Sequence, residues 1–151
     1  MSPGTGVVVV GYGNPLRGDD AVGWRVAEFL AADPRQAGAH VLTAHQQLPE
    51  LAAELGEAEL AVLVDARVGD PPGSISVAHV APSAARGAFG HHLTPAALAG
   101  LALSIAGRSA DVVVVSVGIE STRPGDGLSH AVAEAVSSVQ EVVADLVLAH
   151  A

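Results

Sequence analysis

The sequence predicts an α/β domain, a three-layer sandwich in which helices cover both faces of a mainly parallel, five-stranded sheet. Three short runs, at residues 7–10, 60–64 and 112–115, are rich in valine and apolar at nearly every position. Strands that are buried on both faces have this composition. Helical patterns separate the runs, and strands that alternate with helices indicate a parallel sheet between two helical layers.

In the first half of the chain, the strand at 7–10 leads through a glycine turn into a helix expected over residues 20–32. Asp33-Pro34 ends this helix, because proline cannot continue it. A weaker strand at 39–43 and a short helix at 49–55 follow. Large apolar side chains at helical spacing form the expected core face of the first helix: Val22, Val26, Phe29 and Leu30.

In the second half, the strand at 60–64 precedes an alternating segment at 74–80, which is typical of a half-buried edge strand. Thr94 and Pro95 predict a helix start, and Gly107 predicts its end. In that helix Leu98, Leu101, Ala102 and Ile105 form the expected core stripe, while Leu103 widens the apolar surface. The last helix begins near Ser129, with apolar residues at intervals of three and four: Val132, Val136, Val139, Val143 and Leu146.

The composition limits the classes of function. A chain of 151 residues is expected to form a single domain, here taken as 1–151. The net charge is −9 and basic residues do not cluster, so nucleic acid is not an expected partner. There is no cysteine, so a metal would need carboxylate, imidazole, backbone or water ligands. Neither a signal peptide nor a membrane span is indicated, and we expect a soluble, cytoplasmic monomer.

Potential metal ligands follow the strands at one edge of the predicted sheet. Asp19 and Asp20 follow the first strand, Asp65 directly follows the run at 60–64, and His91 and His92 precede the helix at Thr94. Sites in such folds form beyond the carboxyl ends of the strands. Two carboxylates and an imidazole at this edge predict a divalent-cation site completed by water.

Each of these residues also has a purely structural interpretation. Asp19 is expected to cap its own helix, and Asp20 is equally compatible with a first-turn acid favoured by the helix dipole. Asp65 is compatible with an ion pair to Arg17 or Arg67, and the histidines with solvated loop residues. A dinucleotide loop is disfavoured, because Leu16 stands where the third glycine of the fingerprint belongs.

Residues 11–23, Gly-Tyr-Gly-Asn-Pro-Leu-Arg-Gly-Asp-Asp-Ala-Val-Gly, resemble the opening motif of the hydrogenase maturation proteases. Segments 45–51, 64–66, 91–93 and 117–120 resemble further elements of that family in the same order, so the resemblance covers nearly the whole chain. It implies that Asp20, Asp65 and His91 are metal ligands, with His92 in reserve because only His91 keeps a leucine two residues later. Many members carry Glu in place of Asp20, and the chain lacks a proline directly after Glu120.

The resemblance implies an endopeptidase that removes the C-terminal extension of a nickel–iron hydrogenase large-subunit precursor. Nickel, supplied by the precursor, would be the recognition element, and Asp20 and Asp65 would also be catalytic. No serine or threonine lies in a nucleophile turn and cysteine is missing, which favours metal-dependent hydrolysis without a covalent intermediate. The alternative from another class is a non-catalytic, metal-dependent binding or assembly module for the same precursor.

Overall fold

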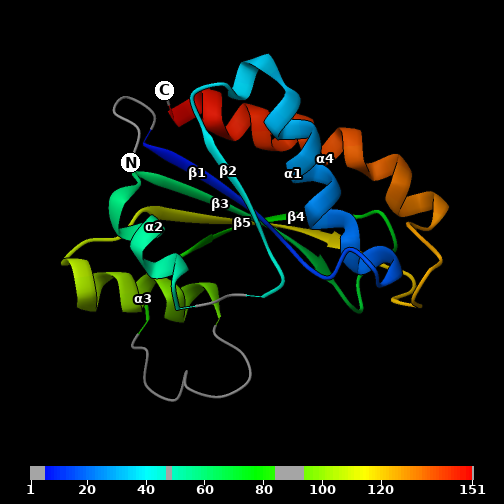
Figure 1. Ribbon diagram of the computed structural model, residues 1–151, viewed down its shortest axis with the longest axis horizontal. Coiled ribbons are helices and arrows are strands. Elements are labelled where there is room, and N and C mark those ends of the chain that lie inside the picture. Colours follow the sequence, from blue (N-terminus) through cyan, green and yellow to red (C-terminus); the bar gives the residue numbers. More distant parts are fainter. Residues whose placement is uncertain (1–5, 47–48, 84–93, 151) are drawn as a thin grey trace.

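The computed structural model describes residues 6–46, 49–83 and 94–150. Its centre is a five-stranded sheet in the order β2-β1-β3-β5-β4. All neighbouring strands are parallel except β4, which pairs antiparallel with β5 at one edge (Figure 1). The strands are β1 (Val7–Tyr12), β2 (His40–Ala44), β3 (Leu60–Arg67), β4 (Ile75–Val80) and β5 (Asp111–Gly118).

In the described part of the chain, four α-helices cover the two faces of the sheet and confirm the predicted three layers. One face carries α1 (Val22–Ala32) and α4 (His130–His150), and the other carries α2 (Leu51–Glu57) and α3 (Pro95–Ala106) (Figure 1). Two short 3₁₀ turns, η1 (Gly18–Ala21) and η2 (Pro34–Gln36), flank α1. Along β3 the side chains alternate between two cores, because successive residues of a strand point to opposite faces.

The predicted helix signals work as expected in the second half of the chain. The Thr94 hydroxyl accepts a hydrogen bond from the Ala97 amide at 3.1 Å, and Gly107 ends α3 with a left-handed φ of 76°. The apolar repeat of α4 faces the core, with Val132, Val136, Val139 and Val143 buried and Leu146 packed against them.

Two apolar residues expected in the core are on the surface. Phe29 is 54% exposed, because the buried stripe of α1 runs through Gly23 and Ala27 and leaves Phe29 outside it. Ile105 is 70% exposed, since it lies in the last turn of α3, beyond the buried stripe of Leu98 and Ala102.

Helix α1 lies unusually close to the strands beneath it. A Cβ atom on Gly23 would lie 2.3 Å from the Tyr12 carbonyl oxygen and 2.7 Å from that of Val64. A Cβ atom on Gly11 would lie 2.1 Å from the Gly23 carbonyl oxygen. Only glycine permits this approach, which brings the start of α1 against the carboxyl ends of β1 and β3.

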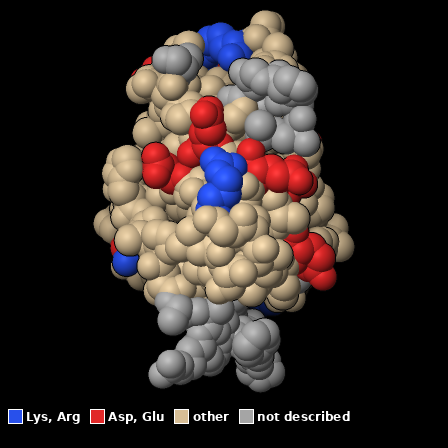
Figure 2. Space-filling view, turned by 90° about the vertical axis from the view of Figure 1, so that its left-hand side faces the viewer, with Lys and Arg blue, Asp and Glu red and all other residues tan. Residues whose placement is uncertain are grey.

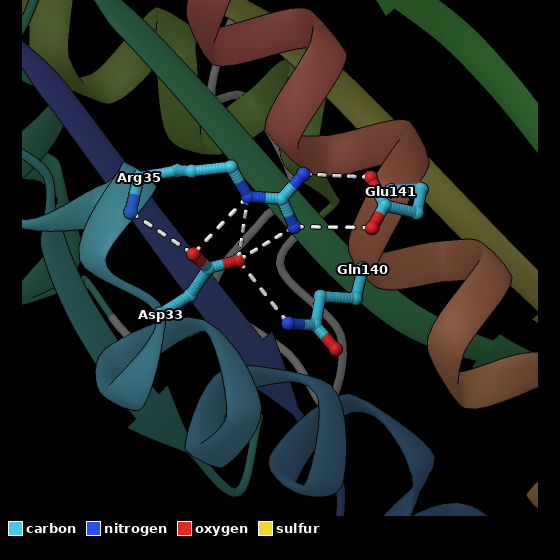
Figure 3. Close-up of polar contacts among 4 residues, drawn as sticks. All are labelled: Asp33, Arg35, Gln140 and Glu141. Carbon is cyan, nitrogen blue, oxygen red and sulfur yellow. Dashed lines mark hydrogen bonds and ion pairs between the residues drawn. The ribbon is translucent and has the colours of Figure 1, made fainter.

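An ion-pair network joins the end of α1 to α4. The Arg35 guanidinium lies 2.7 Å from Asp33 Oδ2 and 2.8 Å from Glu141 Oε2, and Gln140 Nε2 donates to Asp33 Oδ2 at 3.2 Å (Figure 3). Hydrogen bonds from Arg35 hold the pKa of Asp33 well below its usual range. No helix in the described part of the chain combines the length and apolarity needed to cross a membrane.

Candidate functional site

The predicted acids Asp20 and Asp65 lie together at the carboxyl edge of the sheet. Asp20 belongs to η1, which follows β1, and Asp65 belongs to β3, which extends two residues beyond it to Arg67. Both side chains are partly buried. Their proximity shows in their electrostatics, because the negative charge of Asp20 raises the pKa of Asp65.

Within the described ranges, no basic side chain balances the negative charge of Asp65. Burial raises its pKa to about 6, the hydrogen bond from the Ala66 amide opposes this rise, and the Asp20 charge adds to it. That amide donates to Asp65 Oδ1 at 2.8 Å. Among the described residues, no ion pair forms with Asp65, since Arg67 pairs with Asp70 at 3.5 Å instead. The proposed pairing of Asp65 with Arg67 or Arg17 is therefore wrong.

The turn before η1 holds Asp20 in place. The Asn14 amide donates to Asp20 Oδ2 at 2.8 Å, and Asn14 Oδ1 accepts from the Leu16 amide at 2.9 Å. Gly13 has a φ of 129°, and a Cβ atom there would lie 1.9 Å from the Asp20 carbonyl oxygen. The glycine and asparagine of the opening motif thus shape a tight turn around this carboxylate rather than a phosphate loop.

Asp19 does not cap its own helix, which corrects the expectation from the sequence. Its side chain is fully buried and accepts hydrogen bonds from the amides of Glu120 (2.9 Å), Ser121 (3.1 Å) and Ser129 (2.6 Å), and from the Ser129 hydroxyl (2.8 Å). Burial raises its pKa, but these hydrogen bonds outweigh burial and leave the pKa below its usual value. Asp19 therefore fastens the segment between β5 and α4 to the turn that carries Asp20.

His91 and His92 lie outside the described residues, so the choice between them stays a prediction. Within the described ranges, no group of three or more histidine, aspartate or glutamate side chains is arranged to hold a metal ion. The described part of the site is thus the pair Asp20 and Asp65.

Tyr12 and Trp24 were not predicted as site residues from the sequence, and the electrostatic effect of Asp65 on Tyr12 shows that Tyr12 lies near the acid pair. Tyr12 ends β1 with a buried hydroxyl, Trp24 Nε1 donates to the Ala44 carbonyl at 3.1 Å, and the Trp24 ring meets His45 edge-on at 5.3 Å. For Tyr12 a signal existed, because the alternation Val8, Val10, Tyr12 places its ring on the α2/α3 face.

The other end of the sheet, where the parallel strands begin, is lined mostly by apolar residues. A cavity of about 640 Å³ lies there, lined by His79, Asp111 and His150 among mostly apolar residues. Figure 2 shows this end of the molecule, with acidic and basic side chains gathered near the middle of the face. Here Arg108 donates to the carbonyl oxygens of Gly56 and Ala58. The acid pair lies outside this cavity, at the far ends of the strands.

The fold and the acid pair define a class: a mainly parallel α/β domain with an acidic site at the carboxyl edge of its sheet. The sequence matches no protein-family model and no curated protein. Among solved structures, a [NiFe] hydrogenase maturation protease HycI from Thermococcus kodakarensis is 25% identical with a TM-score of 0.75, and the match covers 97% of this chain and 94% of that one. The hydrogenase maturating endopeptidase HybD from Escherichia coli is 26% identical with a TM-score of 0.69, covering 91% and 88%.

A hydrogenase 2 maturation peptidase from a thaumarchaeote shares the fold at 24% identity, with a TM-score of 0.70 over 93% of this chain and 96% of that one. These similarities confirm the resemblance indicated by the sequence motifs. The chain is similar to these hydrogenase maturation proteases over nearly its whole length.

Proposed function

We propose that this chain is an endopeptidase that removes the C-terminal extension of a nickel–iron hydrogenase large-subunit precursor. The nickel already bound by the precursor is the recognition element, and the precursor is the protein partner. The HycI and HybD neighbours carry the names of a maturation protease and a maturating endopeptidase, which supports the reaction class. Processing in the cytoplasm by a monomer is part of the proposal.

The observation that carries the proposal is the pair of adjacent carboxylates, Asp20 and Asp65, with no basic partner among the described residues. Two like charges in a partly buried site repel, and the raised pKa of Asp65 records that cost together with the cost of burial. A divalent cation between the two would remove the repulsion, and carboxylates are suitable ligands for such an ion. His91 is the proposed third ligand.

The residues also suggest how the peptide bond is cut. A bound divalent ion polarises a carbonyl group or lowers the pKa of water. In the absence of a cation, burial raises the pKa of Asp65 to about 6, so its carboxylate is mostly ionised at neutral pH and is available to hold the ion or to accept a proton from water. Asp20 is held by the Asn14 amide through Oδ2, which leaves Oδ1 for a ligand. In this scheme the water attacks directly and no covalent intermediate forms.

The test is a cleavage assay on purified precursor with and without nickel, followed by mass spectrometry. We expect loss of the C-terminal extension from nickel-loaded precursor only, and no cleavage by Asp20→Asn, Asp65→Asn or His91→Ala. Asp145→Asn, which changes an exposed carboxylate on α4, is the matched control and should cleave normally.

The outcomes separate the alternatives. Equal trimming of nickel-free precursor would remove nickel from the recognition step. Stable binding of the precursor without any change in its mass would favour the non-catalytic assembly module. An inactive His92→Ala together with an active His91→Ala would move the third ligand to His92.

A further inference from the structure

Tyr12 carries a hydroxyl that is buried at the end of β1. It is the last residue of β1, its side chain is 2% exposed, and its ring packs into the core beneath α2 and α3. Among the described residues, the hydroxyl has no hydrogen-bond partner. Native proteins rarely bury a polar group in this way, so an orphaned hydroxyl at the edge of a site calls for a functional explanation.

Asp65 lies beside Tyr12 on the neighbouring strand. β1 and β3 are parallel with Gly11 opposite Val64, so Tyr12 and Asp65 are the next positions along the two strands. Alternation along β3 places Asp65 on the same face as Leu63, which packs in the core that contains Tyr12. Burial, and after it the charge of Asp65, raises the pKa of Tyr12, so the phenol stays neutral and keeps its proton to donate.

The Tyr12 hydroxyl is a hydrogen-bond donor, and the Asp65 carboxylate is a hydrogen-bond acceptor. Asp65 accepts one hydrogen bond from the described residues, at Oδ1 from the Ala66 amide, and Oδ2 has no donor there. An ionised carboxylate can accept several hydrogen bonds, and a phenol offers one donor. Among the described residues, a side chain with an unpartnered donor therefore neighbours, on the adjacent strand, a carboxylate that can accept further hydrogen bonds.

We propose that Tyr12 is the positioning residue of Asp65: its hydroxyl donates a hydrogen bond to the Asp65 carboxylate in the orientation that the carboxylate adopts for the reaction. This inference rests on the proposed peptidase function, because that function defines the working orientation. Tyr12 acts through Asp65 and does not itself touch the peptide bond.

Gln36 provides a matched comparison. Its side-chain nitrogen and oxygen are also buried without partners in the described structure, and the residue is 3% exposed. It belongs to η2, which leads into the start of β2 at the edge of the sheet opposite the acid pair. Replacing Gln36 therefore tests how a buried polar group without partners in the described structure affects stability and cleavage when it lies far from the acid pair.

The first experiment removes the Tyr12 hydroxyl and keeps its ring. Tyr12→Phe should unfold at the same temperature as the wild type or a higher one, yet lower kcat for precursor cleavage about 10- to 100-fold, the effect of one hydrogen bond to a charged group. Gln36→Leu should raise the unfolding temperature and leave kcat unchanged. A Tyr12→Phe enzyme with wild-type kcat would overturn the proposal.

The second experiment does not depend on cleavage. Tyr12 is the chain's only tyrosine, so protein labelled with ¹³C at the tyrosine Cζ gives a single resonance. That resonance should differ between the wild type and Asp65→Asn, and should not move in Gln36→Leu. An unchanged resonance in Asp65→Asn would overturn the pairing. If the wild type fails to cleave any precursor but the resonance responds to Asp65→Asn, the peptidase proposal falls and the Tyr12–Asp65 pairing stands.

Discussion

Replacing Asp65 by asparagine should stabilise the fold while it abolishes cleavage. In the native state the Asp65 pKa is about 6, against an ordinary value of 3.8. The native state therefore binds this proton more tightly than the unfolded state, and the free energy of unfolding falls as the pH rises between these two values. Each pKa unit corresponds to about 1.4 kcal/mol, so ionised Asp65 costs about 2 to 3 kcal/mol above neutral pH. Near pH 4 the cost is below about 1 kcal/mol.

Urea titrations at several pH values measure this effect directly. Trp24 is the only tryptophan and is partly buried, so its fluorescence reports unfolding. Asparagine keeps an oxygen for the Ala66 amide and carries no charge, so other titrating groups cancel in the comparison. We expect Asp65→Asn to gain about 2 kcal/mol over the wild type between about pH 4 and pH 8.

Asp145→Asn, which changes an exposed carboxylate on α4, is the matched control and is measured over the same range. Parallel stability curves for the wild type and Asp65→Asn would refute the assignment of Asp65 as a strained, uncompensated carboxylate.

Three further predictions concern stability. Gln36→Leu should raise the free energy of unfolding by about 1 kcal/mol, because it removes a buried amide without partners; thermal unfolding measures it. Asp19→Asn should lower it by about 2 to 3 kcal/mol in urea titrations, because the asparagine NH₂ group would face backbone amides that need an acceptor. Arg35→Met should weaken the acid dependence of stability. Arg35 lowers the pKa of Asp33 in the native state, which stabilises the wild type at pH values above the unfolded-state pKa near 4. The wild type loses this stabilisation as the pH falls towards the native pKa of Asp33, whereas Arg35→Met has less of it to lose.

Each of these predictions has an outcome that contradicts it. A destabilised Gln36→Leu protein would mean that the amide has a partner in solution. Unchanged stability in Asp19→Asn would mean that the segment between β5 and α4 does not depend on this carboxylate. If the free energy of unfolding falls equally with decreasing pH in Arg35→Met and in the wild type, Asp33 does not contribute to the acid dependence of stability.

The layers and most of the elements follow from features that are local in the sequence. The strands follow from runs of valine that are buried on both faces, and the two ends of α3 follow from the Thr94 cap and from Gly107. None of these features depends on residues far away along the chain. Phe29 and Ile105 were misplaced for a different reason. Their exposure depends on how each helix is rotated on the sheet, and the close approach through Gly23 decides that rotation for α1.

The site was predictable only in part. The topology rule brought Asp20 and Asp65 to one edge, and the structure places them there. The role of Asp19 was not predictable, because its partners lie more than 100 positions away along the chain. A capping aspartate and a cross-linking aspartate look the same in sequence, and only the packing of the segment at Ser129 distinguishes them.

The glycines at 11 and 23 impose a requirement that is independent of chemistry. Both are needed because the backbone of α1 lies directly against the backbone of β1 and β3, and a side-chain carbon at either position would push α1 off the sheet. Over evolutionary time the two glycines and the acid pair should therefore be lost separately. A descendant that no longer processes any precursor would be free to replace its aspartates at 20 and 65, yet would still need both glycines in order to fold.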